Sequence, residues 1–517
     1  MKVKAPKRTK NKLGQRQLVS QDDFYSEATD FEEQAERWIL SDIRKTLRFY
    51  VQAIELYEKG LNAPNATAHG TYNIMYNETR LFLQVYTDYL ANTGYINLLQ
   101  YVRLDDIANV SQLALPLNEI IDRFEKVTER FPDERSWDLD SNLLTSYLTL
   151  IESADSYSLR GEDIVELTRK FADLSRHSIE NQFSELKSWD ATIEEEESGF
   201  ERDTTGSNAS ARDGSGVVSQ QDDMSESMEM TDQITVETLS ELLSNSYKFV
   251  QSLMEIIIEA RLGESSTINP VQLNYLDDMM KKFTLQLKDV HQTISESLTL
   301  DEDQINVVLE ANRGIEFIAN GDLSSIETYV SETLNSSEIS TELLLAKIDV
   351  LDFAVTCIDS NGDLQVQWQM CSLLNKLLAE ARKKLADVRA NTTGKMSSVG
   401  SQLSSLVFQQ CDVLIASSDF ELRRWVIKRR AGSNGDIKTM EVLMKNAKTF
   451  LVNASKIAER PCGLEENIVD KLKRNYIYNQ AQARLSVLEG RDQAISNADI
   501  SELYADHPFY KNAPTFQ

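Results

Sequence analysis

Apolar residues recur with a helical period along most of the chain. The stretch from Trp38 to Leu61 places them at three- and four-residue steps, namely at Leu47, Tyr50, Val51, Ile54 and Tyr57. Such spacing puts one apolar stripe on a helix. Ser41-Asp42 precedes the stripe, so we expect the turn and second helix of a hairpin, after a first helix that starts near Asp22. A hairpin with one apolar stripe buries it by packing against further hairpins, and the sequence predicts an all-α chain.

The region from residue 22 to residue 189 is predicted to hold about three helical hairpins. A third helix has apolar residues at helical spacing, namely Tyr72, Tyr76, Leu83 and Tyr86. Further helices are expected around Phe124, from Trp137, and from Glu162 to Trp189.

Part of this region resembles tetratricopeptide repeats (TPR). Ile120, Phe124 and Pro132 follow the spacing of a second repeat helix, in which an aromatic residue comes four positions after a smaller one and a proline eight positions later. Thr46, Tyr50 and Ala53 fit the same register without the proline. The resemblance, to degenerate repeats, implies stacked helical hairpins of the TPR-like α-solenoid class.

The second half of the chain, residues 233–504, is predicted to be a second helical array. One long helix is expected over Thr235 to Leu262, and Asn269-Pro270 has the pattern of an N-cap followed by proline. Gly314, Phe317, Gly321 and Asp322 follow the order of a repeat's first helix and turn. A minor break is expected at 391–400, a hairpin turn at Ser418 to Glu421, and an irregular tail at 505–517.

Residues 190–232 differ in composition from both arrays. They are rich in Ser, Gly and acids and poor in large apolar residues, so we expect a disordered acidic linker. Thr192 and Ser219 each have an acid three residues later, which is typical of acidophilic kinase sites. A plain spacer without regulation is an equally good interpretation.

Charge is the strongest compositional feature. The chain has a net charge of -28, although residues 1–21 form a basic tail that is predicted to be disordered. An acidic surface repels nucleic acid phosphates and anionic lipid and attracts basic proteins. Within the tail, a basic cluster resembles a nuclear-import signal, with the alternative of a solubilising tail: Lys4, Lys7, Arg8 and Lys10.

Motifs for catalysis, metal or cofactor binding are not found in the sequence. The histidines are scattered singly, at His69, His177, His291 and His507, and the four cysteines form no Cys-x-x-Cys pair. With neither a signal peptide nor an apolar run of membrane-spanning length, we expect a reduced intracellular compartment and no membrane association. The chain is therefore predicted to be neither an enzyme nor a cofactor-binding protein.

A cationic cluster stands out against the acidic background, namely Arg423, Arg424, Lys428, Arg429 and Arg430. It is interpreted either as a site for an anion, RNA or an acidic peptide, or, as we favour, as arginines that pair with acidic neighbours inside the fold. On a helix, Arg423 and Arg430 would share one face, and Arg424 and Lys428 another.

These features favour a protein-binding function. The leading hypothesis is a non-enzymatic adaptor or escort chaperone of nucleus and cytoplasm that binds a basic client, such as a ribosomal or nucleic-acid-associated protein. The alternative is a structural subunit of a larger nuclear or cytosolic complex, with Trp38, Trp137 and Trp425 at interfaces. An RNA- or anion-binding role through residues 423–430 is less favoured, and direct binding of nucleic acid is not expected.

Overall fold

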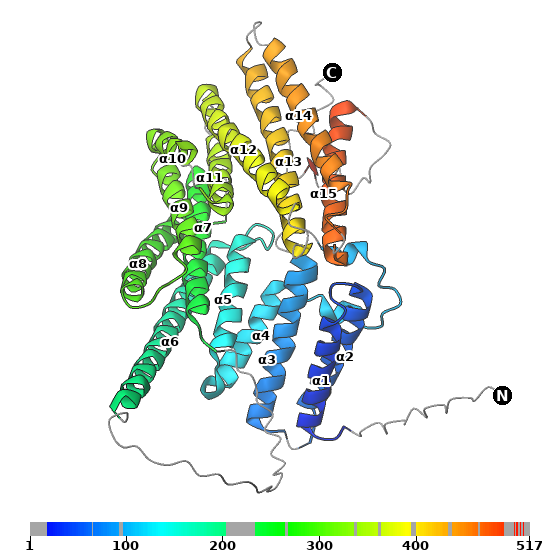
Figure 1. Cartoon of the computed structure of the whole chain (residues 1–517), viewed down its shortest axis with the longest axis vertical. Coiled ribbons are helices and arrows are strands. Elements are labelled where there is room, and N and C mark those ends of the chain that lie inside the picture. Colours follow the sequence, from blue (N-terminus) through cyan, green and yellow to red (C-terminus); the bar gives the residue numbers. More distant parts are fainter. Residues whose placement is uncertain are drawn as a thin grey trace, which may run out of the picture. The chain divides into compact units, whose positions relative to one another are not determined.

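The computed structural model contains only helices and their connections over the part of the chain that it describes (Figure 1). That part comprises residues 18–64, 66–91, 97–202, 233–263, 267–335, 339–359, 363–393, 400–432, 437–463 and 466–490, with single positions at 501, 503, 504, 507 and 510. For residues 189–202, 393 and 400–402, the backbone alone is described. Fifteen α-helices lie in these ranges, which confirms the predicted all-α class.

The first of two compact units comprises residues 1–135 and 467–472. Its α-helices are α1 (Gln21–Glu36), α2 (Ile43–Leu61), α3 (Ala68–Val85) and α4 (Leu117–Arg130). Helices α1 and α2 form the predicted hairpin, and the Asp42 side chain caps α2 by accepting from the Lys45 amide. Along α2 the predicted apolar stripe is buried, with Leu47 and Tyr57 fully enclosed. The helical period therefore identified this hairpin and the face that it buries.

Helix α4 contains the residues on which the repeat resemblance rests. Ile120 and Phe124 are fully buried, and the helix ends at Arg130, before Pro132, which cannot continue it. Between α3 and α4 lie a π-helical segment, Tyr86–Ala91, and the 3₁₀ turns Leu98–Tyr101 and Val110–Leu113. This connection is longer than the short turn of a regular hairpin repeat.

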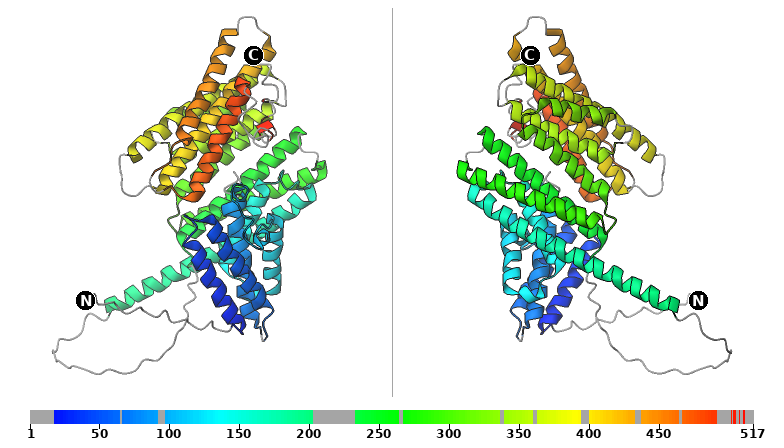
Figure 2. Two further views of the ribbon diagram at one scale, coloured as in Figure 1. Left: turned by 90° about the vertical axis from the view of Figure 1, so that its right-hand side faces the viewer. Right: turned by 90° about the vertical axis from the view of Figure 1, so that its left-hand side faces the viewer.

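The second unit comprises residues 136–466 and 473–517. Its helices up to residue 393 are α5 (Trp137–Glu152), α6 (Gly161–Arg202), α7 (Val236–Leu262), α8 (Pro270–Ser295), α9 (Glu302–Ala319), α10 (Leu323–Asn335), α11 (Thr341–Asp359) and α12 (Leu364–Thr393). Alternate helices contact one another, α5 with α7, α7 with α9 and α9 with α11, while α6 contacts α8 (Figure 2). Hairpins are thus stacked in two layers. Contacts group α5 and α6 with these later helices.

Local signals in this unit correspond to the predicted caps and turns. Thr235 caps α7 through a capping box, and Asn269 caps α8 with Pro270 at its first position. The turn between α9 and α10 uses Gly321, whose φ of 65° is left-handed, and Asp322 accepts from the Ser325 amide at the start of α10.

The last three helices are α13 (Gly400–Ala431), α14 (Ile437–Ala458) and α15 (Ile468–Glu489). The predicted hairpin turn at Ser418 to Glu421 is wrong, because α13 continues through it. Polar residues there bind partners inside the fold: the Asp419 carboxylate accepts from Arg484 of α15 at 3.2 Å and from the Tyr510 hydroxyl at 2.5 Å. A run of polar residues suggests a turn because such residues usually hydrogen-bond to water. Here their hydrogen-bond partners are protein groups inside the fold.

The described part of the chain reaches into two further predicted segments. The backbone of α6 is helical to Arg202, although we had started the linker at residue 190, because glutamate has a high helix propensity and the run from Glu194 to Glu197 favours helix. Residues 203–232 lie outside the described part. In the C-terminal segment that we predicted to be an irregular tail, Tyr510 is fully buried.

Candidate functional site

The cationic cluster predicted as an anion or partner site lies near the end of α13, and its first two arginines bind neighbours in the fold. Arg423 lies 3.9 Å from the Asp352 carboxylate of α11. Arg424 lies 3.4 Å from Glu421, and its guanidinium stacks over the Trp368 ring of α12 at 4.6 Å from the centroid. Both side chains are largely buried, and their positive charges lie next to carboxylates and an aromatic ring.

The remaining cations of the cluster point in further directions. The Lys428 ammonium lies over the Trp368 ring at 4.5 Å, and the Arg429 guanidinium lies over the Trp425 ring at 5.3 Å. Arg429 and Arg430 are exposed. The fold therefore distributes this cluster over several neighbours and does not gather it around one anion.

Other predicted site residues lie outside the described part of the chain. These are the residues of the possible import signal (Lys4, Lys7, Arg8, Lys10) and the possible phosphorylation site Ser219; of Thr192 only the backbone is described. Among the side chains that the structure places, no group of His, Cys, Asp or Glu could hold a metal ion. None of the described helices is long and apolar enough to cross a bilayer.

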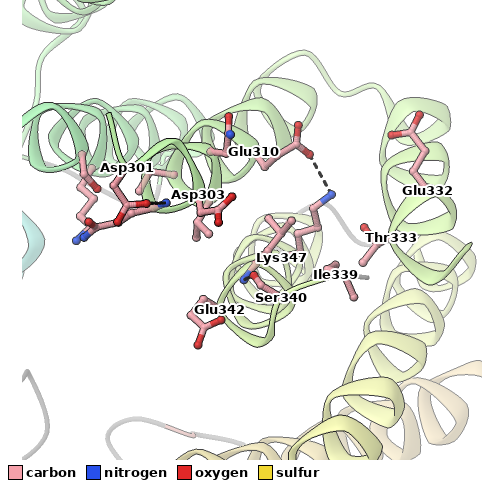
Figure 3. A pocket seen from close by; sticks show the side chains of 16 residues that line it. Asp301, Asp303, Glu310, Glu332, Thr333, Ile339, Ser340, Glu342 and Lys347 are labelled. Carbon is pink, nitrogen blue, oxygen red and sulfur yellow. Dashed lines mark hydrogen bonds and ion pairs between the residues drawn. The ribbon is translucent and has the colours of Figure 1, made fainter. Parts of the chain in front are cut away.

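A groove of about 1000 Å³ lies on α7, α9, α10 and α11, and we call it the acidic groove (Figure 3). Sixteen residues line it. Five of them carry carboxylates, namely Asp301, Asp303, Glu310, Glu332 and Glu342, and two are lysines, Lys248 and Lys347. A groove of this size with an excess of negative charge can accommodate a cationic segment of a ligand.

The start of α9 brings acids to the rim of the acidic groove. Asp301 is the N-cap, and its carboxylate accepts from the Gln304 amide at 3.4 Å. The Asp301 amide donates to the Ser240 hydroxyl of α7 at 3.1 Å, which fixes this end of α9 against α7. Asp303 lies in the first turn, where the helix dipole favours negative charge. Exposed acids are thus held on the rim at no cost to the helix.

An ion pair between a buried lysine and a partly buried glutamate lines the acidic groove. The Lys347 ammonium of α11 lies 3.0 Å from the Glu310 carboxylate of α9, and Figure 3 shows the two side chains pointing toward each other. Lys347 also lies over the Tyr329 ring at 4.0 Å, and the Tyr329 hydroxyl donates to the Glu310 carbonyl. Partial burial opposes ionisation of Glu310, but Lys347 and Arg313 outweigh it and hold the pKa of Glu310 below its usual value.

Because Glu310 neutralises Lys347, this lysine does not cancel the charge of the other carboxylates. Further acids lie beyond the groove on α7 and α11, namely Glu255, Asp349 and Asp352. Asp349 reaches solvent, but protein atoms crowd it, and this partial desolvation, together with Asp352 and Glu255, raises the pKa of Asp349 to about 7. Near neutral pH Asp349 is therefore partly protonated, and a cation beside it would favour the charged form.

Ser244 of α7 adds a neutral group to the lining. Its side chain is fully buried, and its hydroxyl has no hydrogen-bond partner among the described residues. A buried polar group without a partner is unfavourable, and a ligand group could satisfy it.

Sequence reasoning did not find the acidic groove. The run Asp301-Glu302-Asp303 is a local signal that an acidic helix start exists. The pairing of Glu310 with Lys347, however, joins helices that are 37 positions apart in the chain and have no common motif.

The comparisons with known proteins give a family. The chain is 42% identical over 546 aligned positions to the Saccharomyces cerevisiae protein described as "Uncharacterized protein YNL193W", covering 98% of each chain. The chain belongs to the YNL193W family. Two family models match parts of it, the "YNL193W-like protein middle domain" over residues 155–320 and the "YNL193W C-terminal domain" over residues 335–514. No solved structure matches.

The YNL193W domains place the acidic groove at a junction. Its α7 and α9 residues belong to the middle domain and its α11 residues to the C-terminal domain, with Glu332 and Thr333 of α10 between the two matches. Ligand sites occur preferentially where domains meet. All the residues that line the groove lie in the second compact unit, so one stack of helices carries it.

Proposed function

We propose that this YNL193W-family chain is a non-enzymatic adaptor or escort chaperone of the nucleus and cytoplasm that binds a basic segment of a client protein. The observation that carries the proposal is the acidic groove, where five carboxylates outnumber two lysines. Glu310 pairs with Lys347 and Glu332 with Arg313, which leaves Asp301, Asp303 and Glu342 in excess over Lys248. A net charge of -28 adds long-range attraction for a basic client.

The stacked hairpins support the same proposal. Helical-hairpin stacks present extended concave surfaces that bind peptides or proteins. Tetratricopeptide repeats, which residues 22–189 resemble, are stacks of this kind. A ribosomal or nucleic-acid-associated protein has the required Lys/Arg-rich segments. Such clients need shielding from nucleic acid before they assemble.

The test uses the full chain and a fluorescein-labelled peptide of Lys, Arg, Ala and Leu. Asp303→Asn with Glu342→Gln removes two groove charges without changing side-chain size. We expect the peptide affinity to fall about tenfold, and its salt dependence to weaken, because each lost carboxylate removes an attraction that salt screens. Fluorescence anisotropy at low and moderate ionic strength measures both effects.

A matched control neutralises two exposed acids outside the groove, Asp387→Asn with Glu459→Gln, and should leave the affinity unchanged. Equal losses in both double variants would show that only net charge matters and would remove the groove from the proposal.

The client itself can be captured with the tagged chain from its own cells, washed at low and then moderate salt. A basic partner that weakens as salt rises supports the escort function. A fixed set of partners in constant ratio, indifferent to salt, supports the alternative of a structural subunit in a larger complex.

A further inference from the structure

Helix α14 exposes a second apolar face that its own fold does not use. Leu443, Ala447 and Leu451 bury one side of the helix in the core that α13 and α15 share. A separate groove of about 710 Å³ follows the length of α14 on another side of the helix, and Trp425 of α13 also lines it. We call this the α14 groove. An ordinary surface helix has one apolar stripe, so a second one indicates a partner.

The apolar residues of the α14 groove are placed for contact with another helix. Ile437, Met440, Met444 and Val452 recur at three-, four- and eight-residue steps. Ile437 is 61% exposed and Val452 36% exposed. Methionines adapt to the shape of what packs on them. From Ile437 to Val452 the face spans about 22 Å at 1.5 Å per residue, which matches a partner helix of roughly four turns.

Charge selects the kind of helix. Three lysines, Lys445, Lys448 and Lys456, line the α14 groove beside one acid, Glu441. Within the described residues these lysines form no ion pair. In a chain of net charge -28, unpaired cations along an apolar stripe are complementary to carboxylates that flank apolar side chains.

We propose that the α14 groove binds an acidic amphipathic helix of a partner protein. Leucine or methionine side chains of that helix pack on Met440, Met444 and Val452, and its carboxylates meet Lys445, Lys448 and Lys456. This is helix-in-groove recognition, in which apolar anchors give affinity and charge gives selectivity. It is separate from the acidic groove, which attracts ligands of the opposite charge.

An acidic helix fits these observations better than the other anionic surfaces. Nucleic acid phosphates would pair with the lysines but leave the methionines and Val452 uncovered. An anionic bilayer is an extended surface that would also face acidic surface around the groove, whereas a single helix contacts the groove alone. Only an acidic amphipathic helix matches both the stripe and the lysines.

The experiment measures binding of the full chain to a fluorescein-labelled helical peptide of about 20 residues, built of Glu, Ala, Leu and Met with an apolar residue at every third or fourth position. We expect saturable binding that Lys445→Glu with Lys448→Glu weakens about tenfold. Ile437→Ser with Val452→Ser should weaken it as well, including at high salt, because these contacts are not screened.

The matched control reverses two exposed lysines of α12, Lys376→Glu with Lys383→Glu, which changes the net charge equally. It should bind like the wild type, as should the Asp303→Asn, Glu342→Gln variant, so this proposal and the proposed function fail separately. Equal weakening by both lysine pairs, or no saturation at about 100 μM peptide, would overturn the proposal. Binding to phosphatidylserine vesicles that the Lys445, Lys448 variant abolishes, without peptide binding, would assign the groove to a membrane instead.

Discussion

Asp419 carries a charge inside the core of the second unit, and its partners decide whether that charge is tolerated. Arg484 and Tyr510 both donate to its carboxylate, and His507 lies 3.6 Å away. Burial and the Asp419 charge raise the pKa of Tyr510 well above its usual value, so its hydroxyl stays a donor. These contacts attach the C-terminal segment to α13.

Replacement of the buried arginine should therefore destabilise the protein strongly. We expect Arg484→Met to lower the free energy of unfolding by about 3–5 kcal/mol, because it leaves Asp419 buried without its partner. Urea denaturation followed by circular dichroism measures the change. Arg430→Met, at an exposed position of the neighbouring α13, should stay within about 0.5 kcal/mol of wild type. Adding Asp419→Asn to Arg484→Met should recover part of the loss, and no recovery would contradict the explanation by an unpaired charge.

Glu78 of α3 gives the first unit a dependence on pH. Burial outweighs the Arg123 guanidinium at 3.2 Å and, with Glu58 nearby, raises the pKa of Glu78 to about 7. In the unfolded chain a glutamate has a pKa near 4.3, so the folded state binds the proton more tightly. This contribution to stability is complete below about pH 4.3 and is lost as pH rises through 7.

We expect Glu78→Gln to remove that dependence. Wild type should lose about 1–3 kcal/mol of unfolding free energy from this group between pH 4.5 and 8, and the variant should lose correspondingly less. Urea denaturation of both proteins across this range tests the difference. Parallel pH profiles would show that Glu78 keeps an ordinary pKa.

At the scale of elements, close packing of helices depends on single small residues. A Cβ atom at Gly314 of α9 would lie 2.7 Å from a Val350 methyl group of α11 and 3.1 Å from the Tyr329 ring of α10. These neighbours are buried and stiff, so they have little room to move.

Gly314→Ala should therefore destabilise the stack by about 1–3 kcal/mol, although alanine is the better helix former. The measurement is urea denaturation in two backgrounds. In a Val350→Ala background the closest contact is removed, and the same substitution should cost clearly less, with only the Tyr329 contact left. A similar loss in both backgrounds would mean that packing against α11 is not the cause.

At the scale of the whole molecule, the second unit has two grooves of opposite character. The acidic groove and the α14 groove share no lining residue. Under the proposed function, a basic client and the acidic partner would therefore bind different surfaces of the second unit.

We expect the basic and acidic peptides to bind together without strong coupling. Saturation with one should change the affinity for the other by less than about threefold, apart from direct attraction between the two peptides. Titration calorimetry of the second peptide into the saturated complex measures this at moderate salt, where that attraction is screened. Mutual exclusion would show that the two probes compete for one surface.

The sequence by itself determined the helices and most of their ends. Helical periodicity, the Thr235 cap, the Asn269-Pro270 start and the turn at Gly321 depend on residues three or four positions apart, and the same local contacts exist in the fold. The sequence also predicted that Arg424 and Lys428 share a face, and both lie over Trp368. The linker, of which residues 203–232 lie outside the described part, the import signal, the localisation and the client remain predictions.

Only the tertiary structure decided how distant residues meet. It carried α13 through Ser418 to Glu421, because Arg484 and Tyr510 replace water as the partners of Asp419. It also assembled the acidic groove from four helices and exposed the second face of α14. Local spacing fixes what a residue does for its own helix, whereas charge pairing and exposure depend on which helices become neighbours.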